Sequence, residues 1–245
     1  MLENNAGNRP LNMNHVKVLA REMSGGRWKV NGDTICLNSD RLIDGQHRLS
    51  AVIESGVTIE TLVVEGLPSD VFDTKDVGKR RSAGDTLAVR GEIDGKNLAA
   101  ALVVIDRYMT GRVNCVVRYT NTEIEELLEK YPEARRSVRV CHKSKKLVPP
   151  STLSGCHYLF ARKDEEAADE FVRALRTGIG LEEGEPVYIL RERLMQNSIA
   201  KAKLSQPYVM AIIIKAWNHH RAGTKVRFLR YREEGDHPET FPMVE

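Results

Sequence analysis

The stretch of this 245-residue chain that most restricts its fold is a short apolar strand running directly into a helix. Residues 41–43 (RLI) have the character of a strand, and residues 46–55 have the period of an amphipathic helix, with one apolar face formed by Leu49, Val52 and Ile53. Between the two stands the pair Asp44-Gly45, so the junction reads D-G-Q-H-R. Polar side chains in an unbroken row at such a junction add little to a core. They are therefore either an ordinary capped loop or a site.

The physics of a strand, a glycine and a helix favours an anion at this junction. A helix N-terminus leaves backbone N–H groups unpaired and carries a partial positive charge. Gly45 allows a ligand to approach the backbone closely. The helix dipole disfavours His47 and Arg48 in the first turn, unless an anion lies between them and the helix end. Asp44 then supplies a carboxylate that can hold Mg²⁺ or act as a base, and this combination indicates phosphoryl chemistry.

A simpler interpretation stays open on spacing alone. In it Asp44 only caps the helix, and His47 and Arg48 are exposed to solvent.

The motif resembles the signature of the ParB/sulfiredoxin superfamily, whose members share a small α/β fold that binds nucleotides. ParB proteins carry G-E-R-R-x-R-A at the matching place, sulfiredoxins carry G-C-H-R, and free-serine kinases of the superfamily carry D-G-H-H-R. The D-G-Q-H-R string is itself similar to the namesake motif of proteins of phages and DNA-modification islands. The resemblance covers roughly residues 8–95, and the matching positions are Asp44, Gly45, Gln46, His47, Arg48 and Ala51.

This resemblance implies a nucleotide, ATP or CTP, bound with Mg²⁺. His47 and Arg48 would contact its phosphates, and Gly45 and Gln46 would line the same turn. Gln46 stands where sulfiredoxins have their reactive cysteine, so sulfiredoxin chemistry is excluded. Ser50 replaces the second arginine of the ParB motif, which argues against CTP clamping of the ParB kind.

A second polar cluster, residues 73–85 (DTKDVGKRRSAGD), is a candidate second wall of the phosphate site. Arg81 would supply an additional cation and Asp76 a metal ligand, and Arg9 is a weaker candidate for the same wall. The alternative is an exposed loop that opens a helix at Ser82, with Asp85 completing a capping box.

The hydrophobic pattern predicts an α+β protein with two domains. Residues 1–95 would form a small mixed α/β domain, with a helix at 14–24, a hairpin turn at Asn31-Gly32 and a β-rich run at 57–67. Residues 96–245 would form a mostly helical domain for partner recognition. Its predicted helices cover 97–110, 120–130, 151–162, 165–177, 186–197 and 207–221. The last residues, 231–245, are rich in proline and acidic side chains and predict an irregular or frayed tail.

The run 135–146 (RRSVRVCHKSKK) contains no acidic residue, which predicts either a solvated surface or a contact with the phosphates of DNA. Its candidate nucleic-acid contacts are Arg135, Arg136, Arg139, Lys143, Lys145 and Lys146. The net charge of the whole chain is only +3, so a nucleic-acid partner is not required by charge alone.

The four cysteines are scattered without a C-x-x-C pair, which indicates reduced thiols. Cys141-His142 and Cys156-His157 are weak metal candidates, because adjacent residues of a helix or strand point in different directions. No apolar run approaches the length of a membrane span, and no secretion signal opens the chain, so a cytoplasmic protein is expected.

We therefore expect a ParB-like nucleotide hydrolase or phosphotransferase that serves a DNA-related process of a phage or mobile element. Asp44 and His47 are its catalytic candidates. A non-catalytic DNA-binding regulator of the same fold is the alternative, and a metal-dependent nuclease ranks below it. The partners expected are a nucleotide and DNA, with no membrane, and a homodimer is left open.

Overall fold

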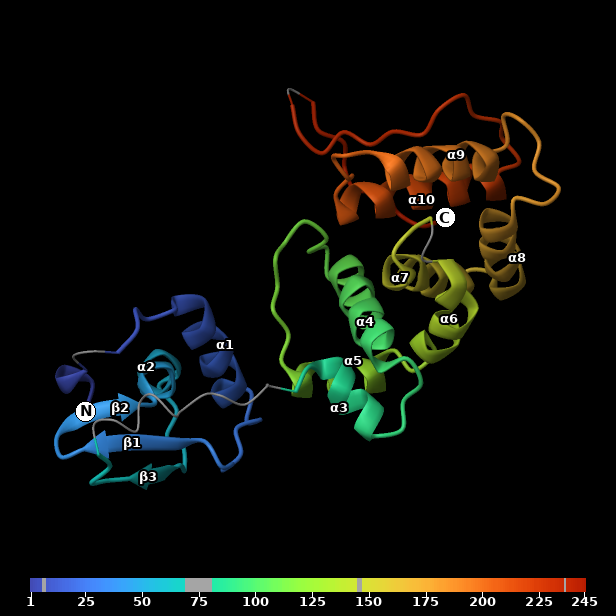
Figure 1. Cartoon of the computed structure of the whole chain (residues 1–245). Helices are drawn as coiled ribbons and strands as arrows, with labels where there is room; N and C mark the ends of the chain where they lie inside the picture. Colours follow the sequence, from blue (N-terminus) through green and yellow to red (C-terminus); the bar gives the residue numbers. More distant parts are fainter. Residues whose placement is uncertain (6–7, 69–80, 145–146, 236) are drawn as a thin grey trace. The chain divides into compact units, whose positions relative to one another are not determined.

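The computed structural model describes the chain except for residues 6–7, 69–80, 145–146 and 236 (Figure 1). Its internal contacts divide the chain into two units, which are described separately below. Unit 1 comprises Met1–Arg80 with Arg118–Thr122, and unit 2 comprises Arg81–Val117 with Glu123–Glu245. Residues 81–95, which the sequence analysis assigns to the first domain, thus group with unit 2.

Unit 1 contains one small mixed sheet in the strand order β2-β1-β3. The strands are β1 (Thr34–Asn38), β2 (Arg41–Asp44) and β3 (Leu62–Val64). β1 pairs with β2 in antiparallel and with β3 in parallel orientation. Only the centre of the predicted β-rich run therefore forms a strand.

The helices of unit 1 are η1 (Leu2–Asn4), α1 (Met13–Ser24) and α2 (Gln46–Ser55). α2 lies between α1 and the sheet (Figure 1). One face of α2 places Ala51 in a cluster with Val16, Ala20 and Met23 of α1. Leu49 packs instead against the sheet cluster formed by Ile35, Leu37 and Leu42. The predicted helix after the Asp-Gly pair is thus confirmed, and it joins the two clusters. Ile53, which the periodicity assigns to its apolar face, is instead 72% exposed.

The prediction of a hairpin turn at Asn31-Gly32 is wrong. The turn between β1 and β2 falls at Ser39-Asp40, where Ser39 has φ 49°. Tight hairpin turns of the Asn-Gly type need positive φ, and Gly32 does not adopt it. The Asn31 side chain instead accepts a hydrogen bond from the Asp33 N–H at 2.8 Å. Trp28 is drawn into the α1–α2 cluster, so the segment before Asn31 does not extend as a strand.

The regular elements in the rest of the described chain are helices, and each helix that the periodicity predicts is found. Proline occupies the first turn of three of the predicted helices, where its missing N–H costs nothing. The local interpretation of Ser82 and Asp85 is confirmed, because the two residues form a full capping box. The helices are α3 (Ala83–Val89), α4 (Gly95–Met109), α5 (Asn121–Lys130), α6 (Ala134–Cys141), η3 (His142–Ser144), α7 (Pro150–Ala161), α8 (Glu165–Thr177), α9 (Pro186–Ile199) and α10 (Gln206–Arg221).

α7 is the central helix of unit 2. Every residue from Thr152 to Phe160 is buried, as expected of a helix covered on all sides. The aromatic centre of the core is Trp217 of α10, whose ring stacks on Phe160 with centroids 4.4 Å apart. The ring of Phe171 meets both of them edge-on, at 5.6 and 5.7 Å. The helices α7, α8 and α10 are joined at this point.

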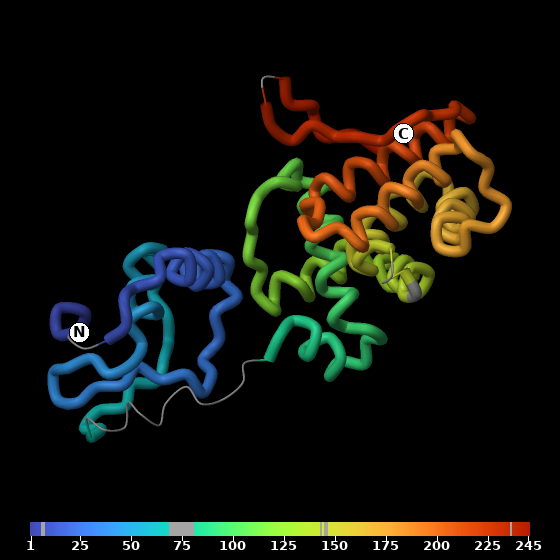
Figure 2. Tube along the Cα trace, turned by 45° about the horizontal axis from the view of Figure 1, so that its top comes forward, coloured from blue at the N-terminus to red at the C-terminus, as the bar shows by residue number. Residues whose placement is uncertain are grey.

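The described residues of 231–245 form no helix or strand, as the composition predicts, but they are not frayed. The last residues run back along the helices of unit 2, as the red trace in Figure 2 shows. Trp217 Nε1 donates to the Glu245 carbonyl at 3.0 Å, and the Val244 N–H donates to the Tyr108 hydroxyl at 2.8 Å. Burial of Tyr231 and Val244 supplies the apolar part of this attachment.

The described part of the chain is therefore a mixture of many helices and one small sheet, as the sequence predicts at this level. Within the described residues, no helix combines the length and the apolarity that a membrane span requires.

Gly155 of α7 provides a test of the packing in unit 2. A Cβ placed there would lie 2.5 Å from Val104 Cγ1 of α4. Helix propensity alone favours alanine over glycine by about 1 kcal/mol. We expect the contact to outweigh propensity, so that Gly155→Ala lowers the free energy of unfolding by about 1–3 kcal/mol in urea titrations. Val104→Ala should partly relieve the clash, and the double variant should lose less than the sum of the two single losses. A stabilised Gly155→Ala protein would contradict this packing.

Candidate functional site

The turn between β2 and α2 depends on Gly45. Its φ of +105° lies in a region that residues other than glycine rarely adopt. A Cβ at this position would also lie 2.5 Å from Ile35 Cδ1 and 3.3 Å from the Ile35 Cα. Glycine is thus required here by the close approach of β1, and α2 begins directly after it without a side-chain cap.

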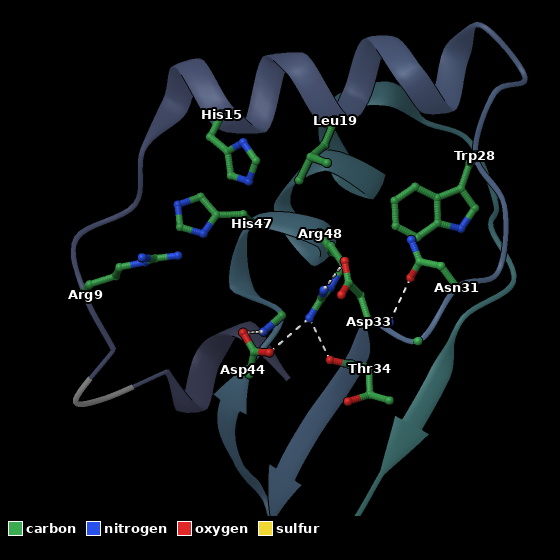
Figure 3. Close-up of a pocket in the computed structure, with 12 residues that line it drawn as sticks. Arg9, His15, Leu19, Trp28, Asn31, Asp33, Thr34, Asp44, His47 and Arg48 are labelled. Carbon is green, nitrogen blue, oxygen red and sulfur yellow. Dashed lines mark hydrogen bonds and ion pairs between the residues drawn. The ribbon is translucent and has the colours of Figure 1, made fainter. Parts of the chain in front are cut away.

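A polar pocket of about 290 Å³ opens beside this turn. Figure 3 shows its walls: Arg9, His15 and His47 on one side, and Trp28 and Asn31 on the other. The start of β1, the end of β2 and the first turn of α2 form its base. The lining residues are Arg9, His15, Leu19, Trp28, Asn31, Gly32, Asp33, Thr34, Asp44, Gly45, His47 and Arg48. Five residues predicted for the site therefore meet in one pocket: Arg9, Asp44, Gly45, His47 and Arg48.

Arg48 is the most constrained side chain in the pocket. Its Nη2 donates to the Thr34 carbonyl at 2.6 Å and to Asp44 Oδ2 at 3.2 Å, and its Nη1 lies 3.6 Å from Asp33 Oδ2. Its Nε is buried and has no hydrogen-bond partner among the described residues. Arg48 is thus not the solvent-exposed first-turn residue of the simpler interpretation. It ties α2 to β1, and one donor remains unsatisfied.

His47 connects α2 to the start of α1. Its Nε2 accepts a hydrogen bond at 3.0 Å from the N–H of Asn12, the N-cap of α1. An accepting Nε2 places the proton of the neutral ring on Nδ1. The His15 ring lies beside it, with centroids 5.2 Å apart. His47 therefore reaches the pocket with one ring nitrogen already used.

Gln46 is buried and holds the N-terminal segment instead of lining the pocket. Its Nε2 donates to the Arg9 carbonyl at 2.8 Å, and its Oε1 accepts from Asn5 Nδ2 at 2.9 Å. This anchorage places Arg9 at the pocket rim, where its guanidinium points toward His47 (Figure 3). Gln46 therefore affects the pocket indirectly, through the position of Arg9.

Asp44 accepts a hydrogen bond from the Gly45 N–H at 2.7 Å through Oδ1 and the Arg48 contact through Oδ2. Its side chain is 37% exposed, and that of Asp33 is 66% exposed. Both carboxylates face Arg48, whose charge they offset. Within the described residues, no three His, Cys, Asp or Glu side chains gather as a metal site would require.

The proposed second wall is not brought to this pocket by described residues. Arg81 is exposed and belongs to unit 2. Asp76 lies in 69–80, outside the described residues.

Sequence reasoning missed several pocket residues: His15, Leu19, Trp28, Asn31 and Asp33. The Asn-Gly-Asp segment was interpreted as a turn, although a polar loop following a lone tryptophan is also typical of a ligand site. His15 gives no local signal, because only the packing of α1 on α2 brings it to His47.

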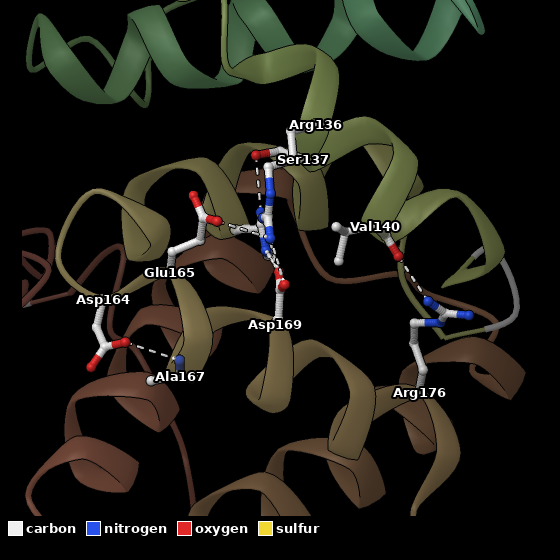
Figure 4. Close-up of polar contacts among 9 residues, drawn as sticks. Arg136, Ser137, Val140, Asp164, Glu165, Ala167, Asp169 and Arg176 are labelled. Carbon is white, nitrogen blue, oxygen red and sulfur yellow. Dashed lines mark hydrogen bonds and ion pairs between the residues drawn. The ribbon is translucent and has the colours of Figure 1, made fainter.

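Two arginines of the basic run 135–146 are paired inside unit 2. Arg135 binds Glu92, with nitrogen-to-oxygen distances of 2.6–3.0 Å. Arg136 binds Asp169 in a bidentate manner at 2.5 and 3.0 Å and lies 3.2 Å from Glu165 (Figure 4). These pairs hold the pKa of Glu92 and Asp169 below their usual values, through the hydrogen bonds from Arg135 and Arg136 respectively.

Arg139 is the one exposed arginine of the run, while Lys145, Lys146 and the side chain of Lys143 lie outside the described part of the chain. The phosphate contact expected of this run therefore has Arg139 as its remaining described candidate. The acidic partners of the other two arginines come from α8 and from the segment before α4.

Behind Arg136 lies a buried polar chain. His157 is fully buried; its Nδ1 lies 2.9 Å from Ser137 Oγ and its Nε2 lies 2.8 Å from Asp169 Oδ1. A serine, a histidine and a carboxylate in contact can support nucleophilic catalysis, but Ser137 is also buried and no substrate can reach it. Burial also raises the pKa of the Cys141 thiol to about 12, so that thiol is inert.

Comparison of the chain with family models, with curated proteins and with solved structures gave no match. The site must therefore be interpreted from its own geometry.

The buried histidine predicts a pH dependence of stability. Burial is the main cause that lowers the pKa of His157 below its ordinary 6.5. The unfolded chain then takes up a proton near pH 6.5 that the folded state resists, so stability falls as the pH drops from 7.5 to 5.5. Glutamine does not titrate, so we expect the free energy of unfolding of His157→Gln to fall less than that of the wild type. The difference between the two proteins should be at most about 1.4 kcal/mol per pH unit.

The measurement is urea unfolding followed by Trp217 fluorescence in a Trp28→Phe background, which reports on unit 2 alone. The pKa of Asp169 is lowered as well, so its contribution is lost only at pH values below this window. Parallel curves for the two proteins would show that His157 does not control the pH response.

Proposed function

We propose that unit 1 is a nucleotide-binding domain of the ParB/sulfiredoxin type and that its pocket takes the phosphates of ATP or CTP. The observation that carries the proposal is the pocket itself, which gathers Arg9, His15, His47 and Arg48 around the strand–glycine–helix turn. Cationic and neutral N–H donors that converge at an uncapped helix start form the donor set that an anion needs.

The opposite wall supports the organic part of a nucleotide. Trp28 and Leu19 present an aromatic ring and an aliphatic side chain to the same space. Small-molecule pockets usually enclose about 300–1,000 Å³. A volume of about 290 Å³ is at the lower end, so the pocket would enclose part of a nucleotide and leave the remainder in solvent.

Mg²⁺ would enter with the nucleotide. Asp44 and Asp33 are both turned to Arg48, and a cation between them would compete with the guanidinium. Phosphate oxygens supply the further ligands that two such carboxylates lack, and bound phosphates would draw Arg48 toward themselves. The unsatisfied Nε of Arg48 supports this exchange of partners.

The activity that we propose is hydrolysis of the nucleotide or transfer of its phosphoryl group. Asp44 would act as the base, with His47 beside it, in a DNA-related process of a phage or mobile element in the cytoplasm. Unit 2 would recognise the partner. A metal-dependent nuclease has no support from the described residues, since they contain no group of three metal-ligating side chains.

A specific observation favours the second candidate, a non-catalytic regulator of the same fold. Gln46, His47 and Arg48 each hold another segment of unit 1 in place. A motif that stabilises the fold in this way is useful even in a protein that does not hydrolyse a nucleotide. Release of phosphate from ATP or CTP by the purified protein, with and without DNA, separates the two candidates.

Arg9 gives the cleaner test of binding, because its exposed guanidinium has no ion pair within the described residues. We expect Arg9→Gln to weaken ATP binding about tenfold in calorimetry, through loss of one charge-assisted hydrogen bond, and to leave the urea midpoint unchanged. Lys17→Gln removes the same charge from an exposed position of α1 outside the pocket and should bind ATP as the wild type does. Equal affinities of the two variants would place the phosphates elsewhere.

Asp44→Asn separates binding from chemistry. The amide oxygen can still accept from the Gly45 N–H, so folding should be retained. Removal of a negative charge from the pocket should leave nucleotide affinity equal or higher, while turnover falls by about 10²-fold or more. Calorimetry and phosphate-release assays on the same preparations measure the two effects. Full turnover in the variant would make Asp44 a structural residue, and loss of folding would favour the regulator.

A further inference from the structure

A second pocket, in unit 2, has a different electrostatic character. It encloses about 520 Å³ between α9, the start of α10 and the chain that follows α10. Four α9 residues spaced along one helical face line it: Ile189, Glu192, Arg193 and Gln196. Tyr208, Arg227, Phe228, Leu229 and Arg230 complete the lining. We call this site the α9 pocket.

The arginines of the α9 pocket are not offset by neighbouring acids. Arg193, Arg227 and Arg230 form no ion pair with any described carboxylate, unlike Arg135 and Arg136. Glu192 is the one acidic residue of the lining, so three arginines and one glutamate leave a formal charge of +2. Three side chains of like charge around one hollow repel one another, and an anion with several charges relieves that repulsion.

Phe228 adds an aromatic surface to these charges. Its side chain is 62% exposed, although the next residue along, Leu229, is buried. The Arg230 guanidinium lies over the Phe228 ring at 5.0 Å from its centroid. Leu229 and Tyr231 face the core, so Phe228 and Arg230 project together from an extended strand-like segment.

We infer that the α9 pocket binds single-stranded nucleic acid, with the arginines on successive phosphates and a base stacked on Phe228. Unpaired cations combined with an exposed aromatic ring are the two elements that proteins use to hold single strands. This binding site does not depend on the nucleotide pocket of unit 1, and it differs from the basic run 135–146.

The combination of features excludes the neighbouring classes of ligand. A duplex keeps its bases stacked inside, so it would meet the arginines but leave Phe228 without a partner. An acidic peptide would also satisfy the arginines and make no use of the ring. A single strand uses both, and a pocket of this volume admits an unstacked base.

The test uses the full-length protein and a fluorescein-labelled dT12 strand, with fluorescence anisotropy measured from 50 to 200 mM salt. Arg227→Gln/Arg230→Gln removes two of the cations. Lys163→Gln/Arg173→Gln removes the same charge from exposed positions around α8 and is the matched control. Far-UV circular dichroism and the urea midpoint confirm that each variant is folded.

The wild type should bind dT12 with a slope of log K against log salt of about −2, since each neutralised phosphate of a single strand contributes roughly −0.7. The Arg227/Arg230 variant should lose about tenfold or more in affinity and flatten the slope by about 1.4. Phe228→Ala should lose roughly five- to a hundredfold with the slope unchanged, because stacking involves no counterion release. Glu192→Gln should strengthen binding.

Three results would overturn the inference. The first is no binding of dT12 at 50 mM salt, or equal losses in the Arg227/Arg230 variant and its control. The second is a Phe228→Ala protein that binds as the wild type does, which would leave a purely ionic surface. The third is a duplex of the same length, or a poly-glutamate peptide, that binds as tightly as dT12.

Discussion

The fit of Gly45 against Ile35 is the contact on which the architecture of unit 1 depends. A side chain at position 45 would enter the space of β1 and would also have to adopt a φ of +105°. Only glycine lets β2 turn so tightly that α2 starts above the central strand. That starting point decides where the next three side chains go. Gln46 reaches the N-terminal segment, His47 reaches the N-cap of α1, and Arg48 reaches the backbone of β1.

The side chains of the motif therefore hold the walls of the pocket in place, whether or not a ligand is bound. By anchoring the Arg9 carbonyl, Gln46 brings a cation to the rim. By accepting from the Asn12 N–H, His47 fixes the first turn of α1 and the place of His15. Structural and functional interpretations of the D-G-Q-H-R string are thus not exclusive. A residue can hold the wall and also line the pocket, as Arg48 does.

Features decided by local chemistry could be predicted from sequence. α1 ends at Gly25, α3 opens with the Ser82–Asp85 box, and α9 and α10 begin at prolines, because caps and breakers act within a few residues. Features decided by distant partners could not. Arg135 and Arg136 pair with Glu92, Glu165 and Asp169, which lie far from them in sequence and come to them through helix packing. Trp28 likewise packs against the cluster between α1 and α2, whereas a hairpin at Asn31-Gly32 would have placed it in a strand.

The two pockets differ in how their charge is offset, and this difference fits the different tasks that we propose for them. In unit 1 the arginine closest to the helix start already has Asp33 and Asp44, so an anion must exchange partners with two carboxylates to bind. That exchange costs affinity and moves charged groups next to the ligand, which suits a site where chemistry follows binding. In the α9 pocket the arginines have no carboxylate to give up, and no acid–base pair stands among the lining residues. Such a site gains from holding an anion, which fits the recognition of a nucleic-acid strand that we propose for it.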